Sequence, residues 1–351
     1  MVLTVGVDVH KDTHTAVVAD ELGRELAKRT VAATDAGHRA LVGWAARHAA
    51  GERTWAVEDC RHVSVRLERA LLGAGEQVVR VPPKLMAGTR SSARTRGKSD
   101  PIDALAIARA ALREPDLPIA EHDQSSRELK LLVDHREDLV AERTRMQNRL
   151  RWHLHELDPG IDPPARSLDQ PRRLEALAAR LAEQHSGLVA RLAGELLADI
   201  RERTLRIGAL EREITTLTRQ AAPRLLELPG CGALTAAKIV GETARPGRFR
   251  SEACFAMHAG AAPIPASSGR TDRHRLARGG NRQLNVALHR IAITQTRLPN
   301  SLGQAYYQRR RAGGDTTMEA LRALKRRLAR VVFNLLQPPT TTVAASQPTA
   351  A

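Results

Sequence analysis

The chain has 351 residues, which at roughly 100–200 residues per domain allows two or three domains and excludes a small disulfide-stapled fold. Lys and Arg number 55 against 39 Asp and Glu, and this formal charge of +16 predicts a polyanionic partner, with nucleic acid as the first candidate. Three widely spaced cysteines without a CxxC pair argue against a disulfide framework or a cysteine zinc site and fit a reducing cytoplasm. No apolar run approaches the ~18 residues of a membrane helix, so we expect no membrane partner.

The positive charge is concentrated in the last third of the chain. Residues 1–222 carry 35 cations and 33 anions, whereas residues 223–351 carry 20 cations and 6 anions. Such an excess in one region is typical of a nucleic-acid interface, although an arginine-rich solvated surface would look similar. Only 8 residues are aromatic, so recognition of single-stranded bases cannot rest mainly on stacking and must depend on Arg and backbone amides.

The first third of the chain alternates strand and helix signals. β-rich runs at 3–9 and 15–19 predict a hairpin, and further strands are predicted at 29–33, 54–57 and 78–81. Between and after them, helices are predicted at 38–48, 63–72 and 101–112, followed by a proline-containing linker at 114–123. This order predicts an α/β sheet covered by helices.

The middle of the chain is predicted to be helical throughout. Leu132, Leu139 and Met146 recur every seven residues, and from Ile207 to Ala221 apolar residues alternate spacings of three and four. The proline-rich stretch 158–171 separates the two long helices, which predicts an antiparallel hairpin or coiled coil. A helical bundle within one monomer and a dimerising coil both remain open.

Four acidic residues follow predicted strands or begin a predicted helix. Asp8 ends the first strand, Glu58 follows the strand at 54–57, and Asp100 and Asp103 lie in SDPIDA, where Asp100 is predicted to cap a helix. Carboxylates from separate elements are ligands for Mg²⁺, and two such ions can assist phosphoryl transfer. Taken singly, each acid is also explained as a helix cap or a surface charge.

The basic third contains two candidate phosphate-binding segments. Gly230 and Gly232 lie in a tight turn before an alanine-rich helix, as in helix-hairpin-helix motifs, although a loop between packed helices would look the same. Further on, Ser267 and Ser268 precede a glycine among five arginines, which are Arg270, Arg273, Arg275, Arg278 and Arg282. A hydroxyl among guanidinium groups could attack a phosphodiester, but the phrase Ser-Ser-Gly is also a common linker.

Other chemistry has weaker support in the sequence. His10 and His14 are four residues apart but have no third metal ligand in view. No glycine-rich phosphate loop of the ATPase type is present, so ATP is not implied.

Three phrases, GVDVHKDTHTAVV, VED and GKSDPIDALAIARAA, resemble the RuvC-like domain of the DEDD transposases of bacterial insertion sequences. This is the IS one-ten family, known as bridge-RNA-guided recombinases. The resemblance implies an RNase H-like (RuvC-like) sheet domain in which Asp8, Glu58, Asp100 and Asp103 bind Mg²⁺, as two ions. Glu58 is followed by Asp-Cys-Arg where many members have a small residue and glycine, which leaves the local turn open.

The basic region resembles the transposase domain of the same family, whose serine nucleophile precedes a glycine and lies upstream of a Gly-Asn-Arg phrase. Ser268 matches the nucleophile best, and Ser267 remains an alternative. Gly280, Asn281 and Arg282 match the later phrase, and TTMEALRALKRRLARVVFNLL resembles the closing helix.

Together these features predict a three-part protein of α/β plus all-α class. The parts are an RNase H-like metal-binding domain at 1–115, a helical coiled-coil region at 125–222 and a small basic helical domain at 223–336 with a helix-hairpin-helix-like turn, followed by a disordered tail at 337–351. The residues expected to bind nucleic acid are Gly230, Gly232, Arg270, Arg273, Arg275, Arg278, Asn281 and Arg282.

The resemblance implies a cytoplasmic DNA transposase or recombinase that forms a covalent serine–DNA intermediate. Its partners would be DNA, a guide (bridge) RNA and further copies of the chain in a dimer or tetramer. Two alternatives stay open. One is a metal-dependent nuclease of the Holliday-junction type, in which water attacks the phosphate, and the other is a non-catalytic nucleic-acid-binding protein.

Overall fold

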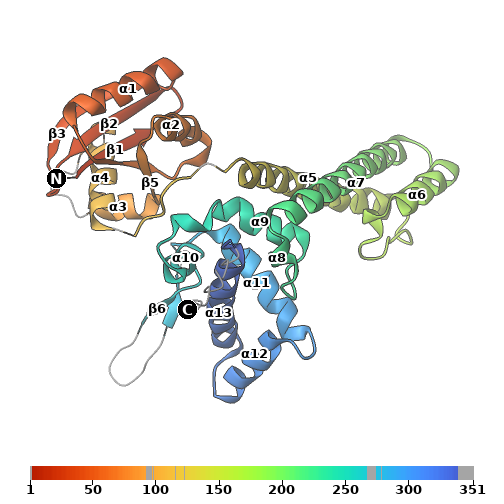
Figure 1. The fold of residues 1–351 in the computed structure, drawn as a ribbon. Coiled ribbons are helices and arrows are strands. Elements are labelled where there is room, and N and C mark those ends of the chain that lie inside the picture. Colours follow the sequence, from red (N-terminus) through yellow and green to blue (C-terminus); the bar gives the residue numbers. More distant parts are fainter. Residues whose placement is uncertain are drawn as a thin grey trace, which may run out of the picture. The chain divides into compact units, whose positions relative to one another are not determined.

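The computed structural model describes residues 2–91, 97, 99–114, 116–121, 123–266, 274–277 and 279–338 (Figure 1). The chain forms two compact units. The first consists of Met1–Asp123 together with Ala244–Ala351, and the second consists of Gln124–Thr243. The predicted domain boundaries stay a prediction. The predicted tail lies outside the described residues from 339 onward.

A mixed five-stranded sheet forms the first part of the first unit. Its strands are β1 (Leu3–Val9), β2 (Thr13–Ala19), β3 (Glu25–Ala32), β4 (Arg53–Glu58) and β5 (Gln77–Val81), in the order β3-β2-β1-β4-β5. The first three strands are antiparallel neighbours, whereas β4 runs parallel to β1 and β5 runs parallel to β4. The predicted hairpin and the later strands are therefore present, with β3 starting four residues earlier than expected.

Helices α1 (Asp35–His48), α2 (Arg61–Gly73), α3 (Pro83–Ser91) and α4 (Asp100–Arg113) surround this sheet. Side chains alternate along β1, and the buried Val5, Val7 and Val9 pack in one core with residues of α1 and α2. The residues between these valines face the other side, where α4 packs against β1 and β2. Gly6 makes this packing possible, because a Cβ at Gly6 would lie 2.1 Å from the carbonyl oxygen of Ala104.

The segment after α4 was predicted to be a linker, and this prediction is wrong for part of it. Ile119 forms an antiparallel bridge with Val79 in β5. The amide of Ala120 donates to the carbonyl of Val78 at 2.7 Å, and Ala120 is buried. The unpaired edge of β5 has hydrogen-bonding groups to satisfy, and the residues around Ile119 satisfy them despite the neighbouring prolines.

The second part of the first unit is mainly helical. It contains η2 (Pro246–Arg248), α10 (Glu252–His258), β6 (Pro263–Pro265), β7 (His274–Leu276), α11 (Arg282–Arg297), α12 (Leu302–Ala312) and α13 (Thr317–Leu336). Helix α13 packs against α10, α11 and α12, and its Phe333 ring lies 5.6 Å from the ring of Phe255. Strands β6 and β7 form a two-stranded antiparallel ribbon, which the sequence patterns did not predict.

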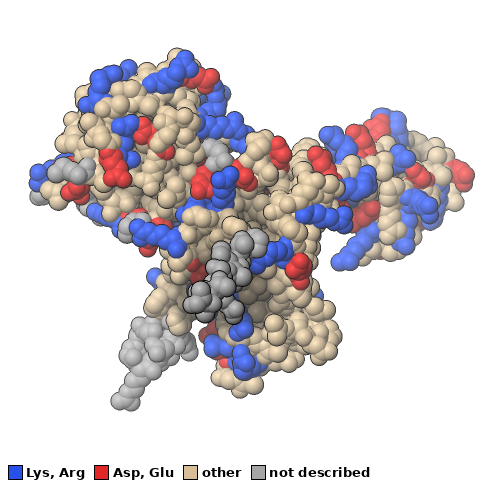
Figure 2. All heavy atoms as spheres, viewed as in Figure 1, with Lys and Arg blue, Asp and Glu red and all other residues tan. Residues whose placement is uncertain are grey.

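The second unit is all-helical. Its elements are α5 (Gln124–Leu157), η1 (Ser167–Asp169), α6 (Pro171–Gln184), α7 (Leu188–Ala221), α8 (Pro223–Leu226) and α9 (Ala233–Thr243). The long helices α5 and α7 run antiparallel, since Arg136 pairs with Glu211 and Arg143 donates to Thr204. Cations and anions are interleaved on the visible face of this hairpin (Figure 2).

Packing of α5 against α7 within the chain accounts for the heptad pattern. Ile207 and Ile214 of the predicted seam are buried, whereas Ala221 is exposed. A dimerising coil stays a prediction. In the described part of the chain, no helix is both long enough and apolar enough to cross a membrane.

Candidate functional site

Two acidic residues lie at the carboxyl ends of neighbouring parallel strands. Val7 of β1 pairs with Val57 of β4, so Asp8 and Glu58 follow at matching positions on the two strands. Both acids alternate with these core-facing valines, which directs them toward the side that α4 covers. Asp8 is 4% exposed, as expected for a residue inside the sheet.

The first turn of α4 supplies the other two acids. The helix begins at Asp100, and its N-cap is Ser99, so the prediction that Asp100 itself is the cap is wrong by one residue. Asp103 is 8% exposed, and its amide donates to the carbonyl of Ser99 at 3.0 Å. The close approach of α4 to Gly6 on β1 holds this first turn near the strand that carries Asp8.

A histidine joins two of the acids. The Nε2 atom of His10 lies 3.1 Å from Oδ2 of Asp8 and 3.6 Å from Oδ1 of Asp100. Potential ligand atoms of Asp8, His10 and Asp100 all lie within 4.8 Å of one another, a spacing that one metal ion could bridge. Sequence reasoning did not assign His10 to the acidic cluster. Its position two residues after Asp8 was the available signal.

The other three predicted acids all affect the pKa of Asp8. Burial raises the pKa of Asp8 above its usual value, and the nearby His10 opposes this rise. Repulsion from Asp103, Glu58 and Asp100 raises the pKa further. A bound cation would relieve this repulsion, because it favours the ionised form of each carboxylate.

Two more side chains belong to the acidic cluster and were missed. Arg90 of α3 forms an ion pair with Asp103, with Nη1 and Oδ1 3.1 Å apart. Cys60 follows Glu58 by two residues, and burial together with the charge of Glu58 raises the pKa of its thiol to about 11. Arg90 could not be assigned without predicting α3. Cys60 falls in the Asp-Cys-Arg phrase that departs from the family pattern.

His10 and His14 do not form a pair. The ring of His14 stacks on His38 with centroids 5.2 Å apart, and both of these residues are buried. Burial lowers the pKa of His14 to about 4, with a further contribution from His38. The two histidines four residues apart thus have separate surroundings, and only His10 contacts the acids that the metal prediction uses.

The Gly-Asn-Arg phrase marks the start of α11. Asn281 is the N-cap, and its Oδ1 atom accepts hydrogen bonds from the amides of Gln283 and Leu284 at 2.9 and 3.1 Å. Arg282 is the first residue of the helix and is exposed. Arg275 lies in β7 and is also exposed. Ser267, Ser268, Arg270, Arg273 and Arg278 lie outside the described residues.

The predicted phosphate-binding turn belongs to the second unit. Gly230 has a φ of +84°, a left-handed conformation that favours glycine, and Gly232 is followed directly by α9. The amide of Cys231 donates to the carbonyl of Leu228 at 2.9 Å, which closes the turn. Phosphate binding at this turn stays a prediction.

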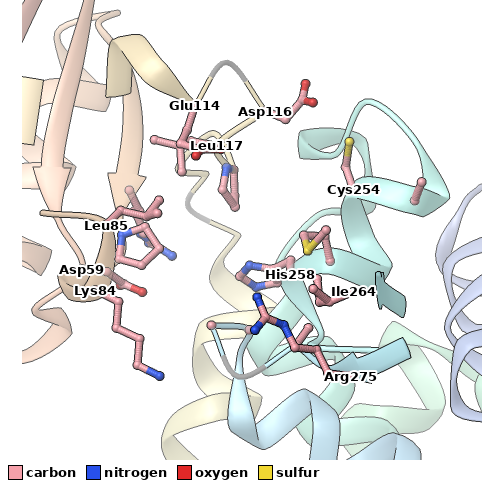
Figure 3. Close-up of a pocket in the computed structure, with 18 of the residues that line it drawn as sticks. Asp59, Lys84, Leu85, Glu114, Asp116, Leu117, Cys254, His258, Ile264 and Arg275 are labelled. Carbon is pink, nitrogen blue, oxygen red and sulfur yellow. The ribbon is translucent and has the colours of Figure 1, made fainter. Parts of the chain in front are cut away.

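A cavity of about 1370 Å³ lies within the first unit (Figure 3). On one side are Asp59 and Lys84, and on the other are His258 and Arg275. Ala266 and His274, the described residues that flank 267–273, also line it. The cavity therefore has on its wall the neighbour of Glu58 and both ends of the segment that carries the two serines.

Comparison with known protein families gives two matches along the chain. A model described as a transposase, of the DEDD type found in insertion element IS110, matches residues 5–159. A second model, described as transposase of the IS116/IS110/IS902 family, matches residues 222–308. The DEDD domain is RNase H-like, which agrees with the mixed sheet of β1–β5 and confirms the α/β part of the predicted fold class.

Relatives match over nearly the whole chain. A protein of insertion element IS116 from Streptomyces clavuligerus is 28% identical, covering 95% of this chain and 94% of the relative. A protein of insertion element IS900 from Mycobacterium paratuberculosis is 30% identical, covering 97% of this chain and 98% of the relative. A protein of insertion element IS110 from Streptomyces coelicolor is 29% identical over 69% of this chain and 71% of its own length. The chain therefore belongs to the IS110 family of insertion-element transposases.

Proposed function

We propose that the chain is a recombinase that cuts and rejoins DNA strands by Mg²⁺-dependent phosphoryl transfer, with Ser268 forming a covalent bond to DNA. The observation that carries this proposal is the acidic cluster. Asp8 is buried at the end of β1, and three further carboxylates contribute to its raised pKa. Acids gathered from two strand ends and a helix start are costly in a folded protein unless a cation binds among them.

Asp8, Glu58, Asp100 and Asp103 would hold the metal through carboxylate oxygens, the ligands that Mg²⁺ prefers. When bound, one or two Mg²⁺ ions would neutralise charge on the scissile phosphate and stabilise the attacking and leaving oxygens. His10 would orient Asp8 and Asp100, since it contacts both carboxylates. Arg90 would fix Asp103 in the same way.

In the proposed cleavage step, Oγ of Ser268 forms a bond to phosphorus while the bond from phosphorus to the 3′ oxygen breaks. The hydroxyl proton passes from Oγ to solvent water, and the departing oxygen takes up a proton from solvent and becomes a free 3′-hydroxyl. The 5′-phosphate stays on Ser268. Attack by a 3′-hydroxyl of another strand reverses these bonds and rejoins the DNA. Nearby guanidinium groups such as Arg275 and Arg282 would bind the phosphate oxygens.

Both halves of the proposed chemistry are encoded in one chain, and they would meet either within one copy of the chain or between two copies. Ala266 and His274, the described residues that flank the segment with the two serines, belong to the same compact unit as the four acids. The cavity lined by Asp59, Ala266 and His274 supports a composite site, because it adjoins both the acidic strand end and the ends of the serine segment. A dimer or tetramer of the chain would bring two such sites to two DNA duplexes.

A guide RNA is the proposed source of sequence choice. The chain has only 8 aromatic residues and a large excess of Arg, a composition suited to binding phosphates rather than reading bases. Base pairing between RNA and DNA would then supply the specificity that these side chains lack.

The proposal is tested by trapping the covalent intermediate. The full-length protein is incubated with Mg²⁺, a duplex spanning the joined ends of its own insertion element, and RNA transcribed from the segment flanking the gene. After denaturation, DNA should remain attached to a peptide containing Ser268. Both Ser268→Ala and Asp8→Ala should abolish the adduct, because neither the hydroxyl nor the metal site acts alone.

Other outcomes separate the rival functions. Cleavage that persists in Ser268→Ala would identify water as the nucleophile, and the protein as a nuclease of the Holliday-junction type. Binding of DNA without any cleavage, unchanged by removal of Mg²⁺, would identify a non-catalytic binding protein. An adduct on Ser267 would keep the mechanism and change only the choice between adjacent hydroxyls.

A further inference from the structure

The chain leaves and re-enters the helical part of the first unit at a single point. Gly260 and Gly280 are packed backbone to backbone, since a Cβ on Gly280 would lie 2.3 Å from the amide nitrogen of Gly260. Gly260 also has a φ of +63°, which favours glycine. Between these glycines the sequence contains β6, β7 and the two serines. We call Ala259, Gly260, Gly280 and Asn281 the loop base.

Hydrogen bonds from α10 and α11 fix the loop base. The amide of Asn281 donates to the carbonyl of His258 at 2.6 Å, which ties the returning chain to the end of α10. The side-chain amide of Asn285 donates to the carbonyls of Ala259 and Gly260, at 3.0 and 2.9 Å. One asparagine side chain thus satisfies two consecutive carbonyls in the turn that follows α10.

Lys325 determines which way this asparagine points. Its Nζ atom donates to Oδ1 of Asn285 at 2.9 Å, so the oxygen end of the amide faces α13 and the nitrogen end faces the loop base. Lys325 is only 7% exposed, and burial lowers its pKa, with Arg322 adding to the effect. Keeping a cation in this position costs folding free energy, which argues that the contact with Asn285 has a specific role.

We propose that Lys325 is a positioning residue that acts through Asn285 to hold the loop base, the point from which the chain runs out to β6 and β7, and that this contact supports the attack on DNA. The inference rests on the proposed function, because it takes residues 267–268 to carry the nucleophile. Lys325 does not need to touch the DNA. Its contribution comes from preorganisation, and a displacement of about 1 Å at a reacting group can cost roughly 100-fold in rate.

Two substitutions break the network at different points. Lys325→Met removes the donor to Asn285 while retaining a long side chain in the buried position. Asn285→Asp keeps an acceptor for Lys325 but removes the amide donor to the carbonyls of Ala259 and Gly260. Arg330→Met is the matched control, because Arg330 is an exposed residue of the same helix that pairs with Glu252 and not with the network.

The first measurement is the rate of serine–DNA adduct formation at saturating DNA, in the full-length protein with the duplex and RNA described above. Lys325→Met and Asn285→Asp should both lower this rate at least 10-fold. The DNA concentration giving half the maximal rate should change less than 3-fold, because the groups that bind phosphate are unchanged. Arg330→Met should keep the wild-type rate.

The second measurement needs neither DNA nor an active serine. Amide hydrogen exchange is followed in peptides covering residues 256–284, where both network variants should lose protection at the amide of Asn281 while helix α13 stays protected. Normal protection and a normal adduct rate in Lys325→Met would overturn the inference. If the wild-type protein forms no adduct but both variants exchange faster than the wild type, the role of the contact network stands and the proposed chemistry is refuted instead. A slower adduct rate with wild-type exchange, or with a proportional loss of DNA affinity, would also overturn it.

Discussion

Two buried imidazole rings give the sheet domain a sensitivity to acid. His14 on β2 and His38 on α1 stack on each other, and both have a lowered pKa, His14 to about 4. Burial disfavours the charged form of each ring, so the folded state binds fewer protons than the unfolded chain between about pH 4 and the ordinary histidine pKa near 6.5. In that window the free energy of unfolding rises with pH. The free energy of unfolding therefore decreases as the pH falls through this window.

We predict that His14→Leu flattens this pH dependence. In the wild type, acidification from pH 7 to pH 4 should lower the free energy of unfolding by up to roughly 3 kcal/mol through His14. Urea unfolding at a series of pH values measures the effect. The exposed His48, replaced by Gln, serves as the control and should leave the slope unchanged. An unaltered slope in His14→Leu would contradict the assignment.

At the same scale, the acids could be anticipated from the sequence but their neighbours could not. Asp8 and Glu58 end β-rich runs, and this local pattern was sufficient to propose that they converge. The contacts made by Arg90 and His10 depend on how α3 and the β1–β2 turn approach the acids. Such tertiary distances leave no periodic signal in the sequence.

At the scale of elements, Gly6 controls how closely α4 approaches β1. A Cβ at this position would lie 2.1 Å from the carbonyl oxygen of Ala104 and 2.8 Å from the Cβ of Ala108. Neither atom is the flexible end of a side chain. The helix that carries Asp100 and Asp103 would have to move away from the strand that carries Asp8.

We predict that Gly6→Ala destabilises the protein by about 3 kcal/mol or more and weakens Mg²⁺ binding. Gly43→Ala on α1 is the matched control, since the added Cβ would meet only a side-chain atom of Arg47 at 3.9 Å. In that helix interior, alanine should stabilise by up to about 1 kcal/mol. Thermal unfolding with and without Mg²⁺ distinguishes the two. Equal behaviour of the two variants would refute the role of Gly6.

The elements that sequence patterns identified are those with a strong local signal. Residues 3–9 were predicted as a strand because they are β-rich, and the long helix α5 was predicted from its heptads, both nearly at their observed bounds. Helix α3 begins at Pro83 and is short, so it lacks a full apolar stripe. The bridge at Ile119 was missed because prolines indicated a linker, whereas pairing to β5 is decided by the free edge of the sheet.

At the scale of the whole molecule, the uneven charge predicts how DNA binding responds to salt. Residues 223–351 hold 20 cations against 6 anions. Replacing the exposed Arg309, Arg310 and Arg311 of α12 with Gln should lower both the affinity and the slope of log affinity against log salt. The slope should fall by about 0.9 for each phosphate that the variant no longer neutralises.

The matched control for this prediction is the triple replacement of Arg172, Arg173 and Arg180, which are exposed on α6 in the region of balanced charge. Fluorescence anisotropy of labelled duplex over ~50–200 mM salt measures both slopes in the full-length protein. The control should retain the wild-type slope. Identical losses of affinity in the two triple variants would mean that the charge of the last third has no special part in binding.

The first unit is built from two separate segments of the chain, which determines where the chain can change in length. The chain departs at Asp123 and returns at Ala244, and Oδ1 of Asp123 lies 3.9 Å from Nε of Arg245. The second unit, which contains the helical hairpin, is therefore an insertion, and the two points of the first unit that it joins lie close together. Whole heptads could be added to or removed from α5 and α7 in pairs without moving either of these points. The reach of the hairpin can in this way diverge between relatives while the acidic cluster and the loop base, which both belong to the first unit, keep their spacing.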